Sequence, residues 1–144
     1  MKDCTFAVTV PADARYLKAI RAFLEPVMQD LFPDEADMLV LALGESCSNI
    51  LKHRRESLHD SLITVTIEIR SRRARFRIGD FCTTEDLPNI HPRDLSDVRA
   101  GGLGTHFIGE IMDRVAYEPE PGRPGRLALV LEKAIPNAEP TDGS

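Results

Sequence analysis

Alternating apolar positions predict strands in several parts of the chain. Near the N-terminus, apolar side chains at positions 4, 6, 8 and 10 alternate with small or polar ones. The segments 63–69 and 74–78 repeat this alternation and are separated by Ser71 and Arg72, which predicts a hairpin. A short strand is predicted at 115–117. The run 127–131 is apolar on both faces and predicts a central strand.

Apolar residues three and four apart predict two long helices between the first strand and the hairpin. The first covers about 13–31, where Pro26 should kink the helix or end it early. The second covers about 34–55, with Asp34 as its N-cap. A shorter helix is predicted at 105–114, after a long irregular segment at 81–100.

Three polar side chains, Glu45, Asn49 and His53, recur every four residues in the second long helix. Four residues are just over one turn, so the three side chains lie on one stripe. A carboxylate and a carboxamide one turn apart, at the edge of a buried face, can hold a hydrated cation and polarise a hydroxyl. An ordinary amphipathic helix has the same spacing. The stripe alone therefore leaves both interpretations open.

A glycine-rich run precedes the short third helix, and it consists of Gly101, Gly102, Leu103 and Gly104 before Thr105. Such a run lets backbone N–H groups approach a phosphate, and the helix dipole favours the negative charge. Runs of this kind also occur in ordinary turns, so this run gains meaning only from its place in the chain.

Composition narrows the class of protein. The 144 residues suit one domain, and the net charge of −5 argues against a nucleic-acid binder that uses a broad basic surface. No apolar run reaches the roughly 18 residues of a membrane span, and the N-terminus lacks the apolar core of a signal peptide. The three cysteines form no CxxC pair, which fits a reducing cytoplasm.

The hairpin carries arginines on one face, at Arg73, Arg75 and Arg77. This face can be a docking surface. The alternative, which the sequence favours, is a solvated sheet face on which Glu68 pairs across the hairpin with an arginine.

The order of these elements resembles the GHKL ATPase superfamily, or Bergerat fold. Within it, the chain is similar to the bacterial anti-sigma-factor serine/threonine kinases of the RsbW/SpoIIAB group. ALGESCSNILKH resembles the N box of the family, and GGLGTHFIGEIMDRVAYE resembles its second glycine box with the following strand. The resemblance covers about 5–133. It implies an α+β fold, a two-layer α/β sandwich with helices on one face of a mixed, mostly antiparallel sheet. The expected ATPase domain is 1–133, followed by a flexible tail at 134–144.

The resemblance implies roles for particular residues. Glu45 matches the catalytic carboxylate, Asn49 the ligand of Mg²⁺, and Asp80 the acceptor of a hydrogen bond from the adenine amino group of ATP. The segment 83–100 matches the ATP lid. The other positions that match the nucleotide site are His53, Cys82, Gly101, Gly102, Leu103, Gly104 and Thr105. For His53, a structural role at the end of the helix is an equal alternative.

The chain departs from the family pattern in two places. After Asp80 it reads Phe81-Cys82-Thr83-Thr84, where the family usually has two glycines, with Cys82 at the first of them. In the last hairpin Gly125 is followed by Arg126, where the family often has threonine.

The expected function is therefore that of an ATP-dependent protein kinase and anti-sigma factor. The resemblance implies a sigma factor and a STAS-domain anti-anti-sigma factor as partners, a homodimer, a cytoplasmic location, and no direct contact with nucleic acid or membrane. One alternative is a degenerate member that sequesters a partner without transferring phosphate. Another is a switch kinase with a different client.

Overall fold

The computed structural model describes residues 2–53, 62–83, 108–119 and 126–136. Its elements follow the predicted order. They are β1 (Cys4–Pro11), a 3-10 turn (Ala14–Tyr16), α1 (Leu17–Leu31), α2 (Ala36–His53), β2 (Leu62–Arg70), β3 (Arg73–Thr83), β4 (Arg114–Pro119) and β5 (Arg126–Ala134). Residues 108–111 form a helical turn before β4. No helix among these residues is long and apolar enough to cross a membrane.

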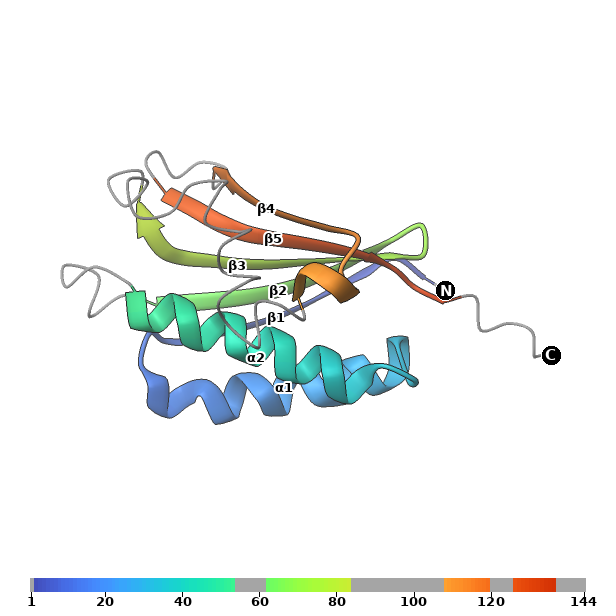
Figure 1. The fold of residues 1–144 in the computed structure, drawn as a ribbon, viewed down its shortest axis with the longest axis horizontal. Helices are drawn as coiled ribbons and strands as arrows, with labels where there is room; N and C mark the ends of the chain where they lie inside the picture. Colours follow the sequence, from blue (N-terminus) through green and yellow to red (C-terminus); the bar gives the residue numbers. More distant parts are fainter. Residues whose placement is uncertain (1, 54–61, 84–107, 120–125, 137–144) are drawn as a thin grey trace.

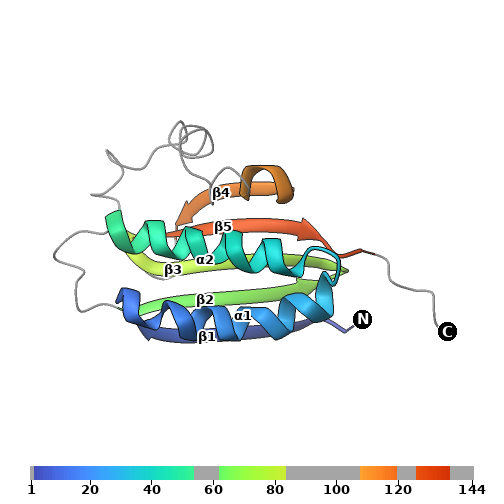
Figure 2. The ribbon, with the colours of Figure 1, turned by 60° about the horizontal axis from the view of Figure 1, so that its bottom comes forward.

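The five strands form one sheet in the order β1-β2-β3-β5-β4. Every neighbouring pair is antiparallel, so the described sheet is not mixed, as the prediction had it. Figure 1 shows α1 and α2 together on one side of this sheet, and Figure 2 shows α1 along β1 and β2 with α2 beside it. The α+β, two-layer prediction is thus confirmed.

The core lies between the sheet and the two helices. The inward side chains of β2, Ile63, Val65, Ile67 and Ile69, are each at most 2% exposed. They pack in one cluster with the apolar stripes of both helices, which include Ile20, Leu24, Met28, Leu39 and Leu43. Because burial of each such side chain stabilises the fold by about 1.5–3 kcal/mol, the period-2 and period-3.6 patterns together fix which faces meet.

The hairpin between β2 and β3 turns through two residues with positive φ, 50° at Ser71 and 64° at Arg72. Two-residue turns of this kind match the twist of the strands. Neither residue is glycine, so the turn is strained. Surrounding groups hold it: Ser71 N donates to Asp3 Oδ1 at 3.0 Å, and Ile135 N donates to Arg72 O at 2.9 Å.

Ile135 is buried, so the described chain still packs against the core beyond Lys133.

Several boundaries differ from those predicted. α2 begins at Ala36, and Asp34 is not its N-cap, because the first helical hydrogen bond runs from Leu39 N to Glu35 O. α1 continues through Pro26, because both Pro26 and Ala22, whose carbonyl loses its partner, face solvent, and water can satisfy that carbonyl. The helix after the glycine-rich run ends at 111 and not at 114, since Arg114 already begins β4. β3 extends to Thr83 and does not end at Gly79 and Asp80.

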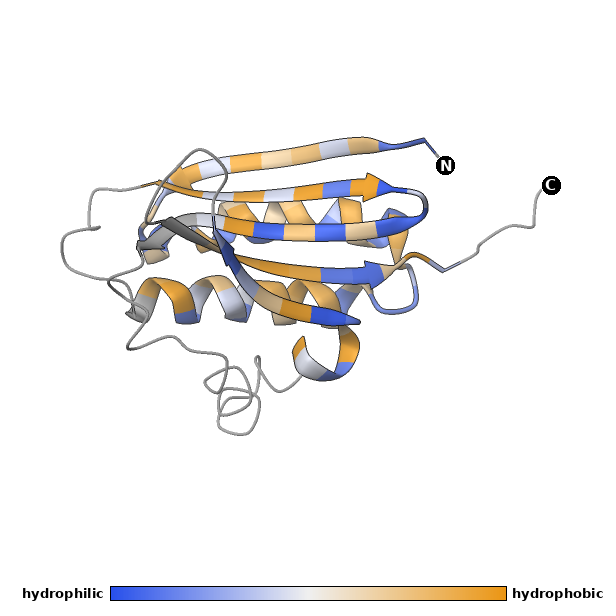
Figure 3. Cartoon of the chain, turned by 90° about the horizontal axis from the view of Figure 1, so that it is seen from above, coloured by the Kyte–Doolittle hydropathy of each residue, from blue (hydrophilic) through white to orange (hydrophobic). Residues whose placement is uncertain are grey.

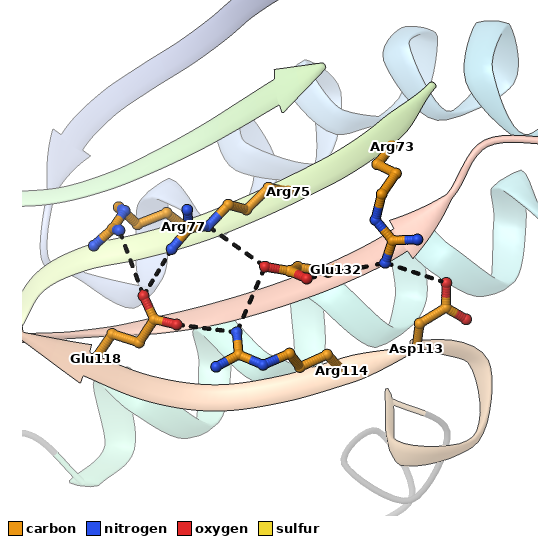
Figure 4. A network of polar contacts seen from close by, with 7 residues as sticks. All are labelled: Arg73, Arg75, Arg77, Asp113, Arg114, Glu118 and Glu132. Atoms are coloured by element: carbon orange, nitrogen blue, oxygen red, sulfur yellow. Dashed lines mark hydrogen bonds and ion pairs between the residues drawn. The ribbon is translucent and has the colours of Figure 1, made fainter. Parts of the chain in front are cut away.

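The sheet face away from the helices carries a network of ion pairs. Arginines alternate with apolar residues along β3, a pattern visible in Figure 3. Arg75 Nη2 donates to Glu118 Oε1 on β4 at 2.7 Å, and Arg75 Nε lies 3.8 Å from Glu132 Oε2 on β5. Figure 4 shows the side chains of β3 reaching toward β5 and β4. The expected pair between Glu68 and an arginine is wrong: Glu68 lies opposite Arg75 in the hairpin but has no ion pair among the described residues, and Arg75 pairs with Glu118 and Glu132.

Glu118 is the centre of this network. Arg114 Nη1 donates to Glu118 Oε2 at 3.0 Å, and Arg77 Nη2 lies 3.8 Å from Glu118 Oε1. Partial burial acts to raise the pKa of the Glu118 carboxyl, but the hydrogen bond from Arg114 and the charges of Arg75, Arg114 and Arg77 outweigh it, so the pKa is lowered. The arginine-rich face is therefore largely neutralised by carboxylates of its own sheet.

Candidate functional site

α2 carries the only two predicted site side chains whose surroundings are described, Glu45 and Asn49. The helix forms because apolar side chains recur on one face, and Leu39, Leu43, Cys47, Ile50 and Leu51 are at most 8% exposed. Glu45 and Asn49 lie on the other side of the helix, one turn apart, and both are partly exposed. Their side chains make no hydrogen bond or ion pair within the described part of the chain. Both groups are therefore available to a ligand.

Glu45 and Asn49 are held in position by the buried face of the same helix. Ser46 is buried, and its hydroxyl donates to Ala42 O at 3.0 Å, so it needs no other partner. Cys47 is also buried, and this burial raises the pKa of its thiol to about 12, against an opposing effect of Arg21. The Cys47 thiol is therefore protonated and structural.

Gly44 permits the close approach of α1. A Cβ built on Gly44 would lie 2.9 Å from Nε of Arg21, whose side chain crosses α2 at this point. The sequence analysis missed this contact, since a glycine inside a helical pattern gives no indication of which side chain lies against it. The glycine directly precedes Glu45, so the packing of α1 fixes the helix where the carboxylate projects.

An irregularity in β3 marks the position of Asp80. The last residue of β3 paired with β2 is Gly79, opposite Thr64. Against β5, Ile78 pairs with Leu129 and Cys82 with Leu127, so three residues of β3 lie between these pairs where β5 has one. Such bulges release backbone from the ladder and are frequent beside active sites. In Figure 1 this end of β3 and the C-terminal end of α2, which carries Asn49, lie at the same end of the molecule.

The segment after the glycine-rich run is anchored by Lys133 of β5, whose side chain is 13% exposed. Lys133 Nζ donates to Ile111 O at 2.6 Å and lies 3.5 Å from Glu35 Oε1. It also lies 5.9 Å from the centre of the Phe32 ring. Ile108 and Met112 bury their side chains in the core. One cation thus joins the helical turn at 108–111 to the connection between α1 and α2, a role that the sequence analysis did not assign.

Several predicted site residues lie outside the described part of the structure. Gly101, Gly102, Leu103, Gly104 and Thr105 belong to that group. The segment 84–100, expected as most of the lid, belongs to it as well. His53, Asp80 and Cys82 have described backbone positions in α2 and β3, but their side chains are outside the description. Their predicted contacts with nucleotide stay predictions.

Glu45 and Asn49 fit the chemistry of Mg²⁺. This ion keeps several of its waters and needs few protein oxygens when phosphates supply the rest. The amide oxygen of Asn49, which has no hydrogen-bond partner among the described residues, suits that requirement. No group of three or more His, Cys, Asp or Glu side chains that could hold a metal occurs among the described residues.

Comparison with known proteins shows which family the domain belongs to. Residues 10–131 match the model of the histidine kinase-like ATPase domain. The chain belongs to this family. It is 28% identical over 132 residues to a serine-protein kinase RsbW of Staphylococcus aureus, covering 84% of this chain and 83% of the relative. The RsbW proteins of strains JH9 and Newman are each 27% identical over 132 residues, with the same coverage.

Membership of the histidine kinase-like ATPase family gives the observed geometry a chemical meaning. The matched region begins at Val10, near the end of β1, and ends at Leu131 within β5, so it includes α2 and the irregular end of β3. An ATPase domain implies ATP binding. Glu45 and Asn49, which have no partner among the described residues, therefore belong to a domain of a kind that binds ATP.

Proposed function

We propose that this chain is an ATP-dependent serine/threonine protein kinase that acts as an anti-sigma factor in the cytoplasm. It binds a sigma factor, and with ATP and Mg²⁺ it phosphorylates a STAS-domain anti-anti-sigma factor, acting as a homodimer. The similarity to RsbW serine-protein kinases over most of the chain supports the class of client. The observation that carries the chemistry is the pair Glu45 and Asn49, which project one turn apart from α2 and have no partner among the described residues.

Phosphoryl transfer needs positioning and charge stabilisation more than covalent chemistry. The acceptor hydroxyl oxygen attacks the γ-phosphorus of ATP, and the bond from that phosphorus to the bridging oxygen of ADP breaks. Glu45 accepts the hydroxyl proton. The amide oxygen of Asn49 would hold Mg²⁺, and the ion would supply positive charge to the phosphates. Asp80, at the β3 bulge, accepts a hydrogen bond from the adenine amino group.

The first experiment separates binding from transfer. The purified chain is incubated with labelled ATP, Mg²⁺ and the STAS-domain protein encoded nearest to its gene, and ATP affinity is measured by calorimetry. Glu45→Ala should lower the transfer rate by about 10²–10⁴-fold and leave ATP affinity within about twofold, because the base acts on the acceptor. Asn49→Ala should weaken ATP binding by about tenfold or more. Glu25→Ala, which removes an exposed carboxylate of α1, is the matched control.

A second candidate function is a binding module that holds a partner without transferring phosphate. The backbone of β3 favours it at one point, because Cys82 and Thr83 still pair with Leu127 and Arg126 where the family has a glycine loop. Under this hypothesis the wild-type chain binds its partner and transfers no phosphate, and Glu45→Ala leaves partner binding unchanged.

A switch kinase with another client would transfer phosphate to a different acceptor. Wild-type transfer that Glu45→Ala leaves unchanged would reject the assigned role of Glu45.

A further inference from the structure

α2 exposes two large apolar side chains on its solvent side. Met38 is 44% exposed and Leu41 is 48% exposed. Residues 38, 41 and 45 are separated by three and four positions, so Met38, Leu41 and Glu45 share one stripe of the helix. We call this the outer stripe of α2. It faces away from the core, because the buried positions Leu39, Leu43 and Cys47 lie on the opposite side.

Single exposed apolar side chains are ordinary on protein surfaces. This pair differs in being continuous with the candidate site. Leu41 precedes Glu45 by one turn, roughly 6 Å, and Met38 precedes it by two turns, roughly 10 Å. The carboxylate at the end of this apolar stretch has no partner in the described part of the chain. An acceptor hydroxyl brought to Glu45 would therefore bring its flanking residues over Leu41 and Met38.

The other end of the outer stripe is acidic. Asp34 and Asp37 are exposed, and neither forms an ion pair or side-chain hydrogen bond within the described residues. The carboxylates of the sheet network are by contrast paired with arginines. The unpaired acidic end favours a partner that carries a basic side chain.

We propose that the outer stripe of α2 docks the phospho-acceptor segment of the client protein. The proposal rests on the proposed kinase function. The acceptor hydroxyl lies at Glu45, an apolar side chain contacts Leu41 and Met38, and a basic side chain lies near Asp37 and Asp34. An extended segment advances about 3.3 Å per residue. The apolar residue therefore stands about two or three residues from the acceptor serine or threonine, and the basic residue about four or five residues from it.

The test uses a double variant, Met38→Gln with Leu41→Gln, because glutamine is a good helix former and both positions are exposed. Phosphorylation of the STAS-domain protein is measured as a function of its concentration, together with ATP affinity by calorimetry. The KM for the acceptor should rise by about tenfold, with kcat and ATP affinity within about twofold. Phe6→Gln is the control, since Phe6 is 38% exposed but lies on β1. Unchanged circular dichroism and thermal midpoint exclude misfolding.

A charge exchange tests the acidic end. Asp34→Lys with Asp37→Lys should raise the KM for the acceptor. Replacing the basic residue near the acceptor serine by glutamate should restore the affinity lost in the lysine variant and weaken binding to the wild-type chain. A structural effect of the lysines would show no such rescue. Absence of rescue would overturn this part of the proposal.

The possible outcomes separate the docking proposal from the proposed function. An unchanged acceptor KM in the glutamine variant, while Glu45→Ala abolishes transfer, rejects the docking surface and leaves the kinase intact. If the wild-type chain transfers no phosphate, the kinase fails, and binding of the same STAS-domain protein is then compared by fluorescence anisotropy. If the wild-type chain binds this protein and the glutamine variant does not, the docking surface is supported. If both bind it equally, or neither binds it, the docking surface is rejected. A change from dimer to monomer in sedimentation would assign the stripe to a subunit interface and also reject it.

Discussion

The two faces of this molecule use polar residues in opposite ways. Among the described residues, the open face of the sheet holds four arginines and three carboxylates in one ion-pair network, centred on Glu118. The outer side of α2 has fewer polar side chains, and those of Glu45 and Asn49 make no hydrogen bond or ion pair with the described residues. A charged group that is satisfied by its own fold contributes to stability, whereas one held without a partner at a partly exposed position is available to a ligand. The arginine-rich face attracts attention in the sequence, but the candidate site lies on the other layer.

Among the variants that test this difference between the two faces, Glu118→Ala should have the largest effect on the free energy of unfolding. It removes the acceptor for Arg75 and Arg114 and leaves partly buried guanidinium groups without that carboxylate. We expect a loss of about 1–2 kcal/mol in the free energy of unfolding, measured by urea denaturation. ATP affinity should change by less than about twofold. Glu25→Ala on exposed α1 is the control, and an equal loss in both variants would show that the network is not specially stabilising.

Lys133→Met tests the anchor between the layers. The change keeps most of the side-chain volume but leaves the Ile111 carbonyl without its 2.6 Å donor and Glu35 without its cation. The expected loss is about 1–1.5 kcal/mol in the free energy of unfolding. Lys18→Met, at an exposed position of α1, should change it by less than about 0.5 kcal/mol. Indistinguishable denaturation curves for Lys133→Met and the wild type would contradict the anchoring role.

The pH dependence of stability should distinguish the two faces as well. The pKa of Glu118 in the folded protein lies below its ordinary value of 4.5. A carboxyl whose pKa is lowered by folding stabilises the folded state above the unfolded-state pKa, and this contribution is lost as the pH falls through the folded-state pKa. The stability difference between wild type and Glu118→Gln should therefore be constant above about pH 6 and shrink below about pH 4. A difference that persists unchanged at about pH 3 would contradict the assignment.

The sequence predicts most of the layers but few of the contacts between them. Alternation in β2 and the spacing of apolar residues in α2 are local patterns, and each specifies a buried face without knowledge of the rest of the fold. The partner of Arg75 depends on β5 lying next to β3, which the hairpin sequence does not encode. That is why Glu68 is predicted and Glu118 is found. The bulge at Asp80 likewise arises from register with β5, and Lys133 acquires its role only when distant segments meet.

Gly44→Ala gives the smallest expected effect and tests how closely α1 fixes the helix that carries Glu45. Alanine gains up to about 1 kcal/mol over glycine in a helix interior. Its Cβ would lie 2.9 Å from Arg21 Nε, an atom of a flexible, exposed side chain that can move aside. We expect a net change in the free energy of unfolding within about 0.5 kcal/mol. In a double-mutant cycle, Gly44→Ala should stabilise the Arg21→Ala background by a few tenths of a kcal/mol more than the wild type, since the obstacle is then gone. Additive effects would mean that Arg21 does not restrict the approach of α1 to α2.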